Sequence, residues 1–75
     1  MEIKVGMMVE TLVDLNDANG YDNQVFIPKG TTGLVCDTED LDKGIVLVEV
    51  WGNGIPEKAW GVYSYRIDDL KVTKS

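Results

Sequence analysis

The sequence predicts an all-β fold, a small five-stranded barrel with a short 3₁₀ turn before the last strand. Two observations lead to this prediction. Apolar and polar residues alternate along most of the chain, and helical periodicity is nearly absent. Glycine, proline, asparagine and aspartate interrupt the alternation at short intervals. Because closure removes unpaired strand edges, a β chain of 75 residues is expected to form one barrel domain over residues 1–75.

The first half of the chain contains two predicted strands and a short apolar return. Residues 7–15 are rich in apolar side chains and form the first strand, and residues 16–23 are a long polar loop. Residues 25–27 then bring the chain back to the core. Proline and glycine mark a turn at 28–30, because proline fixes its own φ and glycine follows it. The second strand covers residues 32–37.

The clearest strand of the sequence covers residues 45–51. Val46, Val48 and Val50 share one face of it, while Leu47 and Glu49 share the other. The preceding segment, residues 38–44, is acidic and ends in glycine, which predicts a solvated hairpin loop.

The end of the chain contains two more predicted strands. Residues 52–57 include two glycines and a proline and form a turn, after which residues 58–65 form the fourth strand. Residues 66–69 are a short 3₁₀ turn, and residues 70–73 are a brief closing strand.

Composition excludes several classes of function. Thirteen acidic and seven basic residues give a net charge of −6, so phosphate would be repelled and nucleic-acid binding is not expected. With no histidine and one cysteine, Cys36, most catalytic bases and zinc sites are missing, and we expect no enzyme activity, cofactor or metal. The N-terminus lacks a signal-peptide pattern and no apolar run could span a membrane, so a cytoplasmic protein is expected.

Four segments carry a resemblance to a known group of folds. They are VGMMV at 5–9, IPKGTTGLV at 27–35, VLVEV at 46–50 and YRIDDL at 65–70. Together they resemble the SH3-like barrel superfamily in its small bacterial or phage forms. The pattern is similar to KOW domains, to the variable chain of ferredoxin–thioredoxin reductase and to the SH3-like subunit of photosystem I. The resemblance implies the fold and, by analogy, a binding or accessory role.

Aromatic residues are the candidate contact surface of such a module. If the valines of residues 45–51 face inward, Leu47 and Trp51 face outward, and Trp60 lies across the following turn. A thin barrel has little interior for two indoles. We therefore expect Trp51, Trp60 and Leu47, with Tyr63 and with Tyr21 of the long loop, to line a protein-binding or self-association surface ringed by acidic residues.

Two other functions stay open. The charge of −6 would suit an acidic inhibitor from a phage or mobile element, which mimics nucleic acid on a host enzyme if its carboxylates gather on one face. The second function is that of an oligomeric pore enzyme, because residues 62–65 resemble a segment of plasmid-type dihydrofolate reductase, whose four chains build one active pore. There, Val62 and Tyr65 match the family's pattern, whereas Tyr63 and Ser64 depart from it.

Overall fold

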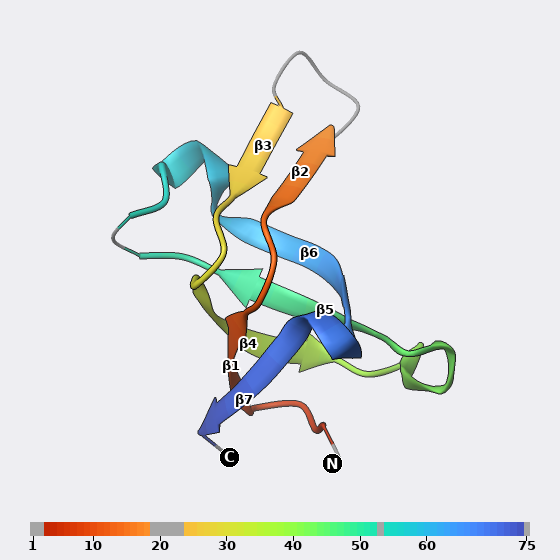
Figure 1. Ribbon diagram of the computed structural model, residues 1–75. Helices are drawn as coiled ribbons and strands as arrows, with labels where there is room; N and C mark the ends of the chain where they lie inside the picture. Colours follow the sequence, from red (N-terminus) through yellow and green to blue (C-terminus); the bar gives the residue numbers. More distant parts are fainter. Residues whose placement is uncertain (1–2, 19–23, 53, 75) are drawn as a thin grey trace.

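The computed structural model describes residues 3–18, 24–52 and 54–74 and is built from antiparallel strands and 3₁₀ turns (Figure 1). The prediction of an all-β fold is confirmed. The strands are β1 (Met8–Thr11), β2 (Leu15–Ala18), β3 (Gln24–Ile27), β4 (Thr32–Asp37), β5 (Ile45–Val50), β6 (Gly61–Arg66) and β7 (Leu70–Lys74). The 3₁₀ turns are η1 (Leu41–Lys43), η2 (Glu57–Ala59) and η3 (Ile67–Asp69), and η3 precedes the last strand as predicted.

The strands form two separate sheets. Five strands are ordered β6-β5-β4-β1-β7, and β2 and β3 form a two-stranded ribbon that projects away from the larger sheet (Figure 1). The predicted closure into a barrel is not found, because β6 and β7 are the two edges of the large sheet and no pairing among the described residues joins them. After η3 the chain turns so that Leu70 pairs with Thr11 of β1, which makes β7 the far edge.

Two predicted element boundaries are wrong, and backbone hydrogen bonds explain both. The strand expected over 7–15 breaks after Thr11, where the Leu12 amide donates to the carbonyl oxygen of Asp69. Strand β2 then begins at Leu15, the last residue of that predicted strand, and continues to Ala18 within what was expected to be loop. The fourth strand begins at Gly61, because the amides of Ala59 and Trp60 donate to the carbonyls of Pro56 and Glu57 and form η2 instead.

The core lies on the inner face of the large sheet and beneath the ribbon. Alternation in β5 is as predicted: its three valines are almost completely buried. They pack with the other buried apolar side chains Ile3, Val9, Val25, Ile27, Val35, Ile55, Ala59, Tyr65 and Leu70. Burying this apolar surface is the main stabilising contribution in so small a domain.

Candidate protein-binding surface

The two tryptophans are neighbours on the outer face of the β5–β6 hairpin. Val50 pairs with Gly61, so the next position along the register sets Trp51 beside Trp60. Because Val50 is buried, strand alternation turns both indoles outward. Their exposed fractions are 43% for Trp51 and 46% for Trp60, and together they border a hollow with Glu49, Val50 and Gly61.

Trp60 is held in a fixed orientation by the preceding loop. Its indole Nε1–H donates to the carbonyl oxygen of Ile55 at 3.2 Å, and its backbone amide donates to Glu57 at 3.0 Å. Ala59, just before it, is buried against the core. An indole that is already oriented loses little rotational freedom when a partner binds it.

Further side chains of the hairpin extend this outer surface. Val62 is 48% exposed and pairs with Glu49, while Leu47 is half-buried and pairs with Ser64. We call the outer surface formed by Leu47, Glu49, Trp51, Trp60 and Val62 the Trp face. It combines large exposed apolar area with one carboxylate, the composition expected of a protein contact.

The structure does not bring all five predicted residues together. Tyr63 pairs with the buried Val48, so it points to the inner side of β6, and its hydroxyl donates to the carbonyl of Ala59 at 2.8 Å. Tyr21 lies outside the described residues. Val62 was not among the predicted residues, although it shares the parity of Trp60 along the strand and Tyr63 does not. Strict two-residue alternation was the signal that could have found it.

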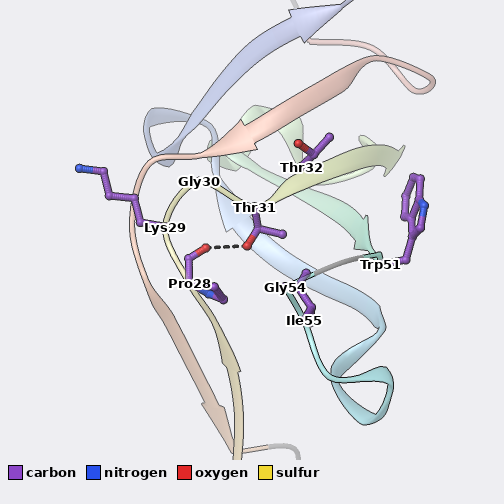
Figure 2. Close-up of a pocket in the computed structure, with 8 residues that line it drawn as sticks. All are labelled: Pro28, Lys29, Gly30, Thr31, Thr32, Trp51, Gly54 and Ile55. Atoms are coloured by element: carbon purple, nitrogen blue, oxygen red, sulfur yellow. Dashed lines mark hydrogen bonds between the residues drawn. The ribbon is translucent and has the colours of Figure 1, made fainter.

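A second hollow, of about 330 Å³, lies on the other side of Trp51. It is lined by Pro28, Lys29, Gly30, Thr31, Thr32, Trp51, Gly54 and Ile55, and in Figure 2 the indole stands at its rim. The Thr31 hydroxyl donates to the carbonyl of Pro28 at 2.6 Å. The Thr11 hydroxyl accepts from the Thr31 amide at 3.0 Å and donates to Pro28 at 3.2 Å. These internal bonds use both hydroxyls to fix the turn, so the hollow offers shape rather than reactive groups.

Acidic residues gather at the end of the sheet that is remote from the tryptophans. Ile45 pairs with Arg66, and the Ile67 amide donates to Gly44 at 2.9 Å, so η3 lies beside the β4–β5 connection. The end of β4, the β4–β5 connection and η3 contribute Asp37, Glu39, Asp40, Asp42, Asp68 and Asp69. Glu49 is the acidic residue that lines the hollow between the indoles.

Cys36 is poorly suited to nucleophilic chemistry. Partial burial is the largest cause that raises the pKa of its thiol, and the negative charges of Glu49 and Asp37 raise it further. Its Sγ also donates a hydrogen bond to the carbonyl of Leu47 at 3.6 Å. A thiol that resists ionisation is a weak nucleophile. Residues 3–18, 24–52 and 54–74 hold no cluster of three or more His, Cys, Asp or Glu side chains placed to bind a metal.

No described helix is long and apolar enough to cross a bilayer. Comparisons of the chain with protein-family models, with curated proteins and with solved structures found no match.

Proposed function

We propose that this chain is a small non-catalytic module that binds another protein through the Trp face. The observation that supports this most is the adjacency of two indoles, each more than two-fifths exposed, on one face of a hairpin. Tryptophan is the residue type most enriched among those that contribute most to binding energy in protein interfaces. Two of them left in water on a chain this small favour a contact surface over a structural role.

The charges beside the indoles favour a partner that presents a basic and an apolar group together. Glu49 lies next to both tryptophans and pairs with the exposed Val62. A lysine or arginine above an indole gains a cation–π interaction and meets the Glu49 carboxylate as well. Val62 and Leu47 offer the adjoining apolar contact.

We also propose that the fold is SH3-like and that the protein is cytoplasmic. The five-stranded antiparallel sheet and the 3₁₀ turn before the last strand support the SH3-like assignment, although the sheet stays open. The cytoplasmic assignment rests on the single cysteine, which cannot form an internal disulfide.

A second candidate function is inhibition of a nucleic-acid-binding protein. It is favoured by the acidic residues that the β4–β5 connection and η3 bring to one end of the sheet. A row of carboxylates can occupy a surface built for phosphates. This function would act through the acidic end and would not need the tryptophans.

One capture experiment tests both candidates. The immobilised chain is exposed to lysate, and the retained protein is purified and titrated against Trp60→Ala, Trp51→Ala and the matched control Val5→Ala, whose wild-type side chain is 60% exposed before β1. We expect either tryptophan variant to weaken binding at least about tenfold, and Val5→Ala to leave it unchanged. Circular dichroism verifies that each variant is folded.

The acidic end is tested in parallel with Asp40→Asn combined with Asp68→Asn. If this variant abolishes binding and the tryptophan variants do not, inhibition replaces the first proposal. Binding that survives every substitution refutes both.

A further inference from the structure

The two edges of the large sheet differ in how well they are protected against pairing with another strand. Edge strand β7 carries Lys71 and Lys74, and its pairing with β1 has an irregularity at Met8 and Val9. Lysines and bulges are devices that block edge-to-edge pairing. Edge strand β6 carries neither lysine nor proline, and its six residues pair with β5 without a break.

The hydrogen-bonding phase of β6 identifies the backbone groups that face outward. The Ile67 amide donates to the carbonyl of Gly44, one position beyond the Ile45–Arg66 pair. Antiparallel ladders alternate hydrogen-bonded and non-hydrogen-bonded pairs. The N–H and C=O groups of Val62 and Ser64 therefore point away from β5, toward the open edge. The N–H group of Arg66 does so as well, whereas its C=O is the N-cap acceptor of η3.

We propose that two copies of the chain pair antiparallel along β6, with the two-fold axis at Tyr63. Val62 then lies opposite Ser64 of the second copy, and their outward-facing backbone groups exchange hydrogen bonds. The two open sheets become one continuous sheet. Such a two-fold contact is self-complementary and closes the assembly at two copies.

The same register also brings side chains of the two copies into contact. Trp60 and Arg66 lie three positions on either side of Tyr63, so each Trp60 meets the second copy's Arg66 on the outer face of the sheet. Arg66 is exposed and Trp60 is 46% exposed, so both are accessible for a cation–π contact, made twice. Gly61 falls opposite Tyr65, where the missing side chain leaves room.

Charge also favours the antiparallel arrangement of identical copies. A net charge of −6 on each copy opposes association. Antiparallel pairing puts the acidic ends of the two copies at opposite ends of the interface between the two β6 strands, because η3 follows Arg66 while η2 precedes Trp60. Asp68 and Asp69 of one copy then lie toward η2 of the other, where Lys58 balances Glu57, instead of toward a second acidic end. No acidic residue occurs in β6 itself.

This assembly does not depend on the proposed binding of other proteins. Trp60 belongs both to the Trp face and to the proposed β6–β6 interface, but Trp51 lies one strand away from that interface. Self-association therefore requires Trp60 and Arg66, whereas binding through the Trp face requires both tryptophans. The two proposals can fail separately.

The test combines mass in solution with residue-level hydrogen exchange on the whole chain. We expect light scattering over a dilution series to give a reversible dimer. We expect the amides of Val62, Ser64 and Arg66 to become protected with concentration. Their neighbours Tyr63 and Tyr65 bond within the hairpin and should show no such change. A chain that is monomeric at every concentration overturns the proposal, as does a dimer that leaves those three amides unprotected.

Substitutions at the two edges show which edge strand forms the dimer interface. Ser64→Pro removes an outward-facing donor without touching the β5 ladder and should give a monomer. Arg66→Glu should weaken the dimer about tenfold or more, because it removes both cation–π contacts. Lys74→Glu makes the same charge reversal on the other edge and should leave the dimer intact. If Lys74→Glu dissociates the dimer and Arg66→Glu does not, the dimer interface is at β7 and the proposal is wrong.

Discussion

Two tyrosines of β6 are expected to respond in opposite directions to the loss of a hydroxyl. Tyr65 is 3% exposed, and its hydroxyl has no hydrogen-bond partner among the described residues. Tyr63, two positions earlier on the same side of the strand, donates to the carbonyl of Ala59 at 2.8 Å. Tyr65→Phe should therefore stabilise the protein, and Tyr63→Phe should destabilise it.

The expected changes in the free energy of unfolding follow from the cost of burying a hydroxyl without a hydrogen bond. An unsatisfied buried polar group costs about 1–3 kcal/mol, part of which is offset by the contacts that the oxygen makes. We expect Tyr65→Phe to raise the free energy of unfolding by about 1 kcal/mol, which raises the melting temperature by roughly 4–8 °C in a chain of this size. Losing the bond of Tyr63 should lower the free energy of unfolding by about 0.5–1.5 kcal/mol.

Alkaline pH should enlarge the difference in stability between Tyr65→Phe and the wild-type protein. Burial, with a smaller contribution from the charge of Tyr63, raises the pKa of Tyr65 from 10.0 to about 12. The folded state thus prefers the protonated phenol. The stabilisation from this preference is complete below pH 10 and is lost as the pH rises through 12. At about 1.4 kcal/mol per pKa unit the loss approaches roughly 3 kcal/mol, and Tyr65→Phe should abolish it.

Urea unfolding of the three proteins, followed by far-ultraviolet circular dichroism at pH 7 and at intervals up to pH 12, measures both effects. A Tyr65→Phe variant that is less stable than wild type at pH 7 would mean that the hydroxyl is hydrogen-bonded in solution. The reasoning from its burial would then be refuted. Equal alkaline loss in wild type and Tyr65→Phe would refute the pKa argument.

Three further changes test other parts of the fold. Gly33→Ala should cost about 1–3 kcal/mol in urea unfolding, since its Cβ would lie 2.9 Å from the carbonyl oxygen of Glu49; an unchanged midpoint would contradict this. Thr11→Val leaves the buried Thr31 amide without its acceptor and should cost about 1–3 kcal/mol, whereas Thr73→Val on exposed β7 should cost little. Cys36 should react with iodoacetamide more slowly at pH 8 than an unstructured cysteine peptide, and Glu49→Gln should speed the reaction; equal rates would contradict the raised pKa.

Local patterns in the sequence predicted the strands better than their assembly. Alternation in residues 45–51 identified β5 and its buried valines, and the turn residues on either side bounded it. The break after Thr11 was not predictable in this way, because it depends on hydrogen bonds to Asp69 and to the 28–31 turn, far along the chain. The open sheet has the same cause, since whether β6 meets β7 depends on where η3 directs the last strand.

The candidate surface was predictable where it followed hairpin register. Trp51 and Trp60 are set side by side by the β5–β6 turn, which is a local feature. Residue type alone predicts Tyr63 in the contact surface, whereas its pairing with the buried Val48 directs it to the inner side of β6. The contrast between the β6 and β7 edges needed the strand order, which alternation does not encode.

The position of β1 between β4 and β7 has a consequence for how the chain folds. Strands β4, β5 and β6 are joined by neighbouring hairpins and need only short loop closures. Strand β1 must find β7 across most of the sequence, as in the pairing of Glu10 with Lys71. Long-range pairings of this kind slow folding. The β4–β5 and β5–β6 hairpins can therefore form before β1 and β7 pair, and until that pairing is made the apolar face of β4–β6 remains open to water.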